Sequence, residues 1–377
     1  KSIFIWLIFG LVSFILSFVF SVSLKASFFD FNNMIIVSLI SIMVYLLITD
    51  ENRLRTIINI IGIFLILESS IAFLQQIGFL PKDLIFGSYA IHHGHGKGLI
   101  LFISEIFVRP CGTLRETNTL AKLLSMYIPI YFVLSLIEKK LKNKVFYIVV
   151  LTFSLFALLL TLGRSSIIGA IVGSLYSLFL VSKFSSKNLP SKKFMITSTT
   201  VIIVITAVIV MFLFRMLYLR FFVFGYLTVS GRMAQYENAI FIIKHHFLTG
   251  IGLNNYDFVM ILNDITGEAA AEPQFPAHNL YLLYFAETGI IGISLFFAFI
   301  ASIYHSVIFT LKKNTGANNI GIYTSASIIG GIGGLTSIFV LSLFGWGFRS
   351  ITLYSVFFLL GLVLSAINIS YQKIEKD

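Results

Sequence analysis

The sequence predicts an all-α, polytopic integral membrane protein with about ten transmembrane helices. Of its 377 residues, 58% are hydrophobic and only 11% are charged, and the mean hydropathy is +0.96. Soluble domains carry roughly 25% charged residues, so this chain has too few charges to cover a surface in water. Its 40 Phe and 16 Tyr point the same way. The chain also contains ten apolar stretches that approach or exceed the length of about 20 residues needed to cross a bilayer.

The ten expected spans are separated by short connections and two long loops. By residue number they lie at 2–23, 34–49, 56–79, 118–137, 145–162, 165–182, 194–214, 279–310, 321–344 and 350–369. The second is short, and the eighth is long enough to protrude from the membrane or to be kinked. The first is too long for a signal-peptide core, so we interpret it as a retained helix. We expect one membrane domain over 1–377, with extracytoplasmic loops at about 80–117 and 215–278.

The basic residues predict the orientation. One set of short connections and tails holds 15 of them: Lys1, Arg53, Arg55, Lys139, Lys140, Lys142, Lys144, Lys183, Lys187, Lys192, Lys193, Lys312, Lys313, Lys373 and Lys376. The opposite side holds 11: Lys25, Lys82, Lys97, Arg109, Arg115, Arg164, Arg215, Arg220, Arg232, Lys244 and Arg349. Short, Lys-rich loops belong in the cytoplasm, so we place both termini there and the two long loops outside. The net charge of +11 therefore reports topology, and we expect no nucleic-acid partner.

The kind of base differs between the two sides. The cytoplasmic set contains 13 Lys and 2 Arg, whereas the outer set contains 4 Lys and 7 Arg. Lys suffices as a topological charge, but a guanidinium binds phosphate bidentately. Some outer arginines could simply pair with acidic residues of the same loop, which are Asp257, Asp264, Glu268 and Glu272. The seven arginines together favour an anionic ligand on the outer face.

The first outer loop contains three histidines within four residues, His92, His93 and His95. They could bind a metal, but their spacing does not fit one helical face, so we favour a solvated loop. The single cysteine of the chain excludes a disulfide framework and a Cys-based metal site. At the end of this loop, Thr117 or Asn118 can cap the fourth helix, whose positive end would face an incoming anion.

Arg164 lies in a tight outer turn between the fifth and sixth expected helices. The guanidinium would reach a lipid head group, although snorkelling at a helix end is the alternative. In the second outer loop, apolar residues recur at steps of three and four from Arg232 to Phe247, which predicts an amphipathic helix with Ser230 as its cap. Such a helix would rest on the membrane surface as a lid over a groove.

His278 opens the eighth helix directly after this loop, beside Asn279. An imidazole at this position could take a proton from an attacking hydroxyl near neutral pH. Glu287 lies about 180° round the helix, so we expect it to pair inside the bundle rather than to orient His278. The charged side chains inside the spans are few, namely Glu68, Lys122 and Glu287, which argues against an ion-coupled carrier.

Several stretches taken together resemble the O-antigen ligase and O-antigen (polysaccharide) polymerase family of bacterial membrane glycosyltransferases. They occur in the family's order and spacing between residues 109 and 350. They are Arg109-x-x-Gly112 with Asn118-x-x-Ala121, Gly163-Arg164-Ser165, Gly231-Arg232-Met233-x-x-Tyr236-x-x-Ala239, Gly250-x-Gly252-x-x-x-Tyr256, His278-Asn279 with Glu287-x-Gly289, and Phe348-Arg349-Ser350.

The resemblance implies a transferase of the GT-C type in the bacterial inner membrane, active on the extracytoplasmic face and independent of metals and other cofactors. Its donor would be a glycan on undecaprenyl pyrophosphate. A polymerase transfers this glycan to the hydroxyl of another lipid-linked repeat unit, and a ligase transfers it to lipid A-core. The Gly250-x-Gly252-x-x-x-Tyr256 turn favours the polymerase. Membrane lipid, a chain-length regulator and a flippase are the further partners expected.

The same resemblance assigns roles to individual residues. Arg164 and Arg232 would hold the pyrophosphate, and His278 would act at the acceptor hydroxyl as the general base. The remaining pyrophosphate-binding candidates are Arg109, Arg215, Arg220 and Arg349, of which Arg215 or Arg220 matches the arginine at the start of the second outer loop, and the supporting candidates are Asn118, Tyr236, Asn279 and Glu287. The rival class is a lipid-linked oligosaccharide transporter, which would need a polar cavity spanning the membrane. A membrane scaffold would leave the seven outer arginines unexplained.

Overall fold

The computed structural model describes residues 1–81, 109–114, 116–184, 225–262, 277–314, 321–348 and 351–374. Every regular element within these ranges is a helix. The helices are α1 (Ser2–Phe20), α2 (Leu24–Leu47), α3 (Glu51–Gln76), α5 (Thr117–Ile137), α6 (Leu141–Leu160), α7 (Arg164–Phe184), α9 (Gly225–His245), α10 (Tyr256–Leu262), α11 (Leu280–Lys313), α12 (Ile322–Leu341) and α13 (Ile351–Ile374).

The predicted class is confirmed: in the described ranges, nine helices are long and apolar enough to cross a membrane. They correspond to nine of the ten expected spans, and the expected span at 194–214 lies outside the described residues. The second span is longer than expected because α2 begins at Leu24, where the Ser23 hydroxyl accepts a hydrogen bond from the Ala26 amide at 3.4 Å. Its polar first turns, which hydropathy assigned to a loop, are part of the helix.

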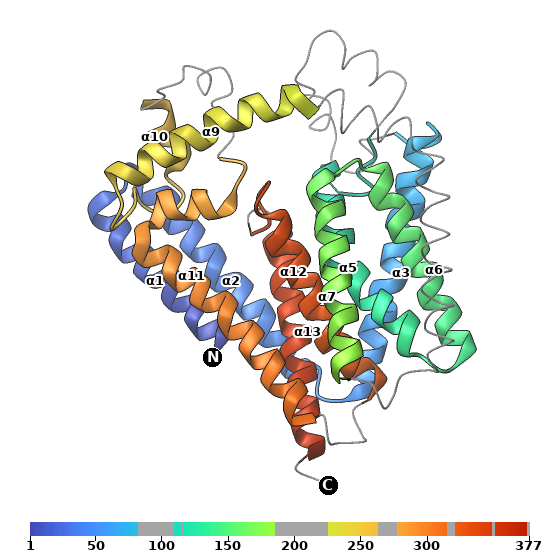
Figure 1. The fold of residues 1–377 in the computed structure, drawn as a ribbon. Coiled ribbons are helices and arrows are strands. Elements are labelled where there is room, and N and C mark those ends of the chain that lie inside the picture. The colour runs from blue at the N-terminus through green and yellow to red at the C-terminus, as the bar shows by residue number, and fades with distance from the viewer. Residues whose placement is uncertain are drawn as a thin grey trace.

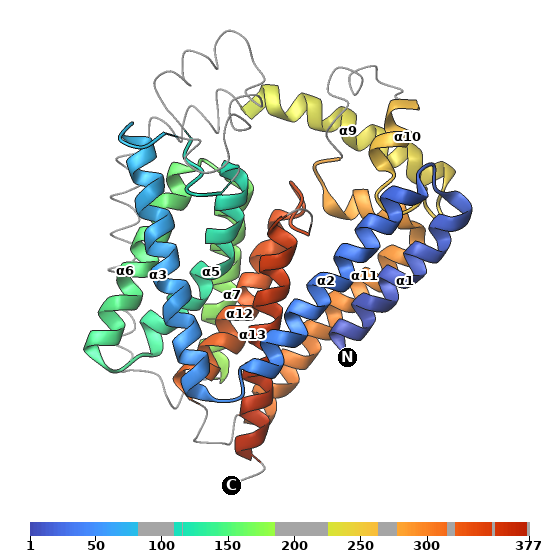
Figure 2. The same ribbon diagram turned by 180° about the vertical axis from the view of Figure 1, so that it is seen from behind.

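The helices form a bundle, and α9 lies across one end of it (Figure 1). α12 and α13 lie in the middle, with α1, α2 and α11 on one side and α3, α5, α6 and α7 on the other (Figures 1 and 2). α12 packs on α7 and α5, while α13 packs on α2 and α12. The helices alternate in direction, and both chain termini lie at the end of the bundle opposite α9 (Figures 1 and 2).

Glycines bring the central helices into close contact. A Cβ on Gly173 of α7 would lie 2.3 Å from the Gly333 carbonyl oxygen of α12. On α12, Gly330 and Gly334 meet the α5 backbone in the same way, with a Cβ on Gly334 2.1 Å from the Met126 carbonyl oxygen. The pairs Gly169/Gly173 on α7 and Gly330/Gly334 on α12 therefore allow close helix approach, since any side chain would push the backbones apart.

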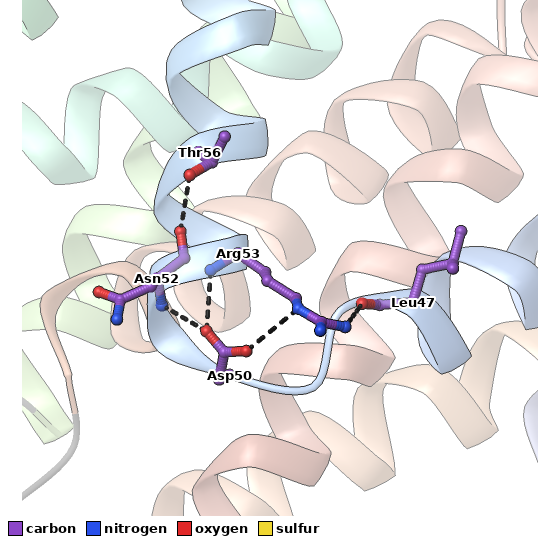
Figure 3. Close-up of polar contacts among 5 residues, drawn as sticks. All are labelled: Leu47, Asp50, Asn52, Arg53 and Thr56. Carbon is purple, nitrogen blue, oxygen red and sulfur yellow. Dashed lines mark hydrogen bonds and ion pairs between the residues drawn. The ribbon is translucent and has the colours of Figure 1, made fainter.

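The end opposite α9 carries the start of α3, which a compact set of polar contacts fixes (Figure 3). Asp50 is the N-cap, and its Oδ1 accepts from the amides of Asn52 at 2.9 Å and Arg53 at 3.0 Å. The Arg53 guanidinium also lies 3.3 Å from Asp50 Oδ2 and donates to the Leu47 carbonyl at 2.9 Å. Such a cap contributes about 0.5–2 kcal/mol, whereas the exposed ion pair adds little.

Two expected caps are wrong. α5 begins at Thr117, its N-cap is Glu116, and no side chain caps it. Asn118 instead accepts a hydrogen bond from Arg109, which removes its side chain from the helix end. α9 begins at Gly225, so Ser230 lies inside the helix and not at its start. The expected helix itself is confirmed, as is the turn that follows it at Thr249 and Gly250.

Candidate functional site

The described candidate residues gather at the end of the bundle that α9 covers. Arg164 is the first residue of α7, Arg232 lies on α9, and His278 precedes α11. The N-termini of α5, α7 and α11 all lie at this end (Figures 1 and 2). Chain segments that are far apart in the sequence thus bring their candidate side chains to one face of the membrane domain.

His278 is held on several sides. Its Nδ1 lies 2.9 Å from Gln235 Oε1, and its carbonyl accepts from the Tyr236 hydroxyl at 3.1 Å. The Trp346 ring lies over the imidazole, with centroids 4.6 Å apart, and the indole N–H donates to the Ala277 carbonyl at 2.9 Å. The imidazole is therefore fixed by α9 on one side and by the α12–α13 connection on another.

These contacts select one tautomer of His278. The backbone amide of His278 also points at Gln235 Oε1, at 3.4 Å. A backbone amide can only donate, so the side-chain atom that faces it must be the oxygen, and Nδ1 must then carry the proton. Gln235 is in turn placed by Tyr256, whose hydroxyl donates to the Gln235 carbonyl at 3.1 Å. The lone pair of the imidazole is consequently on Nε2, the nitrogen that could accept a proton.

The surroundings of His278 keep its imidazole neutral. Burial, with the positive charges of Arg232 and Lys122, lowers the pKa of His278 from 6.5 to about 4. Each of these causes disfavours the imidazolium form. A neutral imidazole at physiological pH is the form that a general base requires.

The two central arginines lie close enough to influence each other. Burial lowers the pKa of Arg232, Tyr236 raises it, and the charge of Arg164 lowers it further. Both side chains are partly buried. Of the loop acids named as alternative partners of the outer arginines, Asp264, Glu268 and Glu272 lie outside the described residues. Two guanidiniums whose charges influence each other could together bind a dianionic group.

Arg109 holds the turn that presents Arg164. Its Nε donates to the Thr161 carbonyl at 2.8 Å, and its Nη2 donates to Asn118 Oδ1 at 3.1 Å. A Cβ on Gly163, directly before Arg164, would lie 2.9 Å from the Ala121 Cβ on α5. The Arg109, Asn118-x-x-Ala121 and Gly163-Arg164 motifs therefore describe one contact region between α5 and the α6–α7 turn. These contacts favour a positioning role for Arg109 over direct phosphate contact.

α11 is kinked at Gly289, as its length suggested. Gly289 has φ 62° and ψ −169°, which interrupts the helix. The Ile290 amide, which would otherwise donate to the Ala286 carbonyl, donates to the Phe247 carbonyl at 2.8 Å, and the Ala286 carbonyl accepts from Ile251 at 3.0 Å. We call the contact between residues 247–252 and 286–290 the kink joint. Its exchanged hydrogen bonds satisfy the backbone groups that the kink exposes.

Glycines are required on both sides of the kink joint. The Gly252 amide donates to the Glu287 carbonyl at 2.9 Å. A Cβ on Gly250 would lie 2.4 Å from that same carbonyl group, and one on Gly289 would lie 2.3 Å from the Leu248 carbonyl oxygen. The Gly250-x-Gly252 and Glu287-x-Gly289 motifs thus form a single structure that joins the end of α9 to α11. The Glu287 side chain is buried, and its Oε1 accepts a hydrogen bond from the Tyr256 amide of α10 at 3.4 Å.

The α1–α2 connection holds the other side of this turn. The Leu253 amide donates to Ser17 Oγ at 2.9 Å, and the Leu253 carbonyl accepts from the Ser27 hydroxyl at 2.6 Å. The Asn255 amide group bonds the Ser23 backbone and Ser27 Oγ. The first two helices therefore hold the turn that follows α9, the helix that carries Arg232.

Asn279 takes a structural role beside the histidine. Its side-chain oxygen accepts from the amides of Tyr281 at 3.0 Å and Leu282 at 3.1 Å, so it caps α11. The Leu280 amide donates to the Ser342 carbonyl at 2.9 Å, which ties the same helix end to the α12–α13 connection. Asn279 thus fixes the backbone on which His278 sits.

Three residues near His278 were not singled out as site residues from the sequence. Gln235 lies three positions after Arg232 on α9, a spacing that places both on one helix face and could have indicated its role. Trp346 is one of only two tryptophans in the chain. Lys122 was noted only as an ionisable group within a span, and its ammonium group donates to the Trp346 carbonyl at 2.9 Å.

Several candidates lie outside the described residues: Arg215, Arg220, Arg349, His92, His93 and His95. Within the described ranges, no group of three His, Cys, Asp or Glu side chains is arranged to hold a metal ion. The candidate site is therefore built from Arg164, Arg232 and His278 with their supporting residues.

The fold and this cationic face define the class: a multi-pass helical membrane protein with a histidine and two arginines gathered at one membrane face. A model of the family described as O-antigen ligase matches residues 148–297, from within α6 to within α11. This segment includes Arg164, Arg232 and His278. The match confirms the resemblance drawn from the motifs and supports the O-antigen ligase and polymerase family for this chain. No curated protein matches the chain at a significant level.

Proposed function

We propose that the protein is a membrane glycosyltransferase of the GT-C type that uses a glycan on undecaprenyl pyrophosphate as its donor. The proposal rests on the location of Arg164, Arg232 and His278 at one end of the bundle. The charge of Arg164 lowers the pKa of Arg232, and the charge of Arg232 lowers the pKa of His278. A pyrophosphate leaving group needs fixed positive charge, and an acceptor hydroxyl needs a base. The three side chains supply both.

In the proposed reaction, the acceptor hydroxyl oxygen attacks the anomeric carbon of the donor glycan. The bond from that carbon to the pyrophosphate oxygen breaks, and undecaprenyl pyrophosphate leaves. The hydroxyl proton passes to His278 Nε2, while Arg164 and Arg232 stabilise the charge that develops on the pyrophosphate. The site would face the outside of the inner membrane, with both termini in the cytoplasm, as the Lys distribution predicts.

Donor binding would also activate the base. The charge of Arg232 is one of the causes that lower the pKa of His278 to about 4. A bound pyrophosphate would neutralise that charge and raise the pKa of His278 toward its ordinary value. The histidine would thus become a stronger base only when the donor is in place.

We assign the acceptor as a second lipid-linked repeat unit, which makes the protein a polysaccharide polymerase. This assignment rests on the resemblance of the Gly250-x-Gly252-x-x-x-Tyr256 turn to polysaccharide polymerases, and the ligase that acts on lipid A-core is the alternative within the family. A chain-length regulator and a flippase remain the proposed partners.

The test is to incubate purified protein in lipid nanodiscs with carrier-linked repeat units, with and without lipid A-core. Longer lipid-linked glycans identify a polymerase, and transfer to lipid A-core alone identifies a ligase. If the donor is unchanged with both acceptors, the proposed transferase activity is wrong.

Variants then assign the roles. Arg232→Lys keeps the charge but loses the bidentate fork, so its rate should fall about 10- to 100-fold. His278→Ala should lower the rate by about 10²–10⁴-fold while donor binding persists. Arg53→Lys, the same arginine change at the opposite end of the bundle, is the matched control and should retain activity.

A further inference from the structure

His278 is connected to α5 through a tryptophan. The Lys122 ammonium group donates to the Trp346 carbonyl at 2.9 Å, and the Trp346 indole donates to the Ala277 carbonyl at 2.9 Å. The indole ring lies over the imidazole of His278 with centroids 4.6 Å apart and planes 38° apart. One tryptophan thus touches the histidine ring, its preceding residue and a lysine from a different helix.

This arrangement places a cation within a span. Lys122 lies on the second turn of α5, where a charged side chain is costly unless it has a partner or a function. The Lys122 ammonium group donates to a neutral carbonyl. Glu116, the acidic residue whose charge influences Lys122, is exposed at the start of the same helix. A structural tie to a carbonyl could be made by a neutral donor such as Gln. The hydrogen bond to the Trp346 carbonyl therefore does not explain why residue 122 carries a positive charge.

We propose that Lys122 and Trp346 are positioning residues for His278: Trp346 fixes the imidazole, while Lys122 anchors Trp346 to α5 and adds a positive charge beside the base. This inference rests on the proposed function, because it takes His278 as the base. It extends the site to residues outside the matched segment 148–297 and joins the α5 side of the bundle to the α9–α11 side.

Among the described residues, charged and titratable groups face His278 from two helices. Arg232 and Tyr236 face it from α9, and Lys122 faces it from α5. On the α12–α13 connection, the described neighbour is the neutral Trp346. Removing the Lys122 charge takes away one of the two cations that act on His278 among the described residues, so protonation of the imidazole becomes less unfavourable and the pKa of His278 rises.

Two readouts test the proposal. Hydrogen exchange at the imidazole C2 position, followed by mass spectrometry, gives a pH midpoint for each histidine without any need for glycosyl transfer, and His245 serves as the internal reference. The pH profile of kcat/KM for glycan transfer reports the same group in the free enzyme. Lys122→Gln keeps a donor for the Trp346 carbonyl and removes the charge. Lys244→Gln removes a charge from the exposed end of α9 and is the matched control.

In Lys122→Gln, both midpoints should rise by several tenths of a pH unit or more, whereas Lys122→Arg and Lys244→Gln should leave them unchanged. Trp346→Phe keeps the ring and removes the indole donor, so kcat should fall about 3- to 10-fold with KM retained, and without a comparable midpoint shift. If the exchange midpoint of Lys122→Gln equals that of Lys244→Gln, the charge does not reach His278 and the proposal is wrong. If the exchange midpoint rises but transfer never depends on His278, the proposed function fails while the electrostatic contact stands.

Discussion

Gly289→Ala should weaken the kink joint and loosen α9 from the bundle. Gly289 has φ 62° and ψ −169°, a conformation that is open in practice only to glycine. An added Cβ would lie 2.3 Å from the Leu248 carbonyl oxygen and 2.5 Å from its carbon, and both are backbone atoms that cannot rotate away. The substitution therefore brings two separate costs, strain at its own backbone and displacement of the facing segment.

The two costs can be given approximate sizes. Holding a non-glycine residue in such a region costs about 1–3 kcal/mol. Forcing extra volume into a packed contact costs about 1–3 kcal/mol more. The sum is about 2–6 kcal/mol. The substitution should also weaken the hydrogen bonds that Ile290, Ile251 and Gly252 donate between the two segments, because these bonds need the segments in register.

The assay is thermal unfolding in detergent, with two matched alanine controls. Gly78 has φ 76° with nothing within 4 Å of an added Cβ, so Gly78→Ala measures backbone strain alone. Gly345→Ala places its Cβ 3.8 Å from the nearest atom and should be nearly neutral. Gly289→Ala should have the lowest Tm of the three, at least about 4 °C below wild type. If its Tm lies within about 1 °C of that of Gly345→Ala, the kink joint is not held as described.

Three further predictions concern the site and its orientation. The acid limb of kcat/KM should lie at a pH of about 4, because His278 must be neutral to accept a proton and its pKa is lowered to about 4. The acid limb of kcat should lie at a higher pH, because the bound donor neutralises nearby positive charge. A kcat/KM limb at 6.5 would contradict this prediction. Arg109→Ala removes the bond to the Thr161 carbonyl and should raise KM for the donor about 10-fold by releasing the turn before Arg164, so a fall in kcat alone would show that Arg109 acts elsewhere. In a Cys111→Ser background, Lys244→Cys should react with an impermeant maleimide in intact cells and Lys142→Cys should not, whereas the reverse labelling would place the site in the cytoplasm.

The sequence by itself determined the class of the protein and the location of most of its helices. Hydropathy is a local property, since each span must be apolar along its own length to lie in lipid. Nine expected spans therefore correspond to described helices, and the amphipathic pattern after Arg232 correctly predicted α9. Span ends were less certain: α2 begins ten residues before its expected start at residue 34, because polar residues that continue a helix beyond the apolar core do not register as a span.

The tertiary structure decided which candidate residues work together. His278, Gln235 and Trp346 are distant in the sequence, and only the packing of α9 and of the α12–α13 connection against the start of α11 brings them into contact. The role of Arg109 likewise depends on a carbonyl of the α6–α7 turn, which no spacing along the chain could indicate. Hydropathy and periodicity describe how one helix meets its solvent. The contacts that orient a base or a guanidinium depend on how the helices pack against one another. This packing is determined by the close approach of small residues and by kinks such as the one at Gly289.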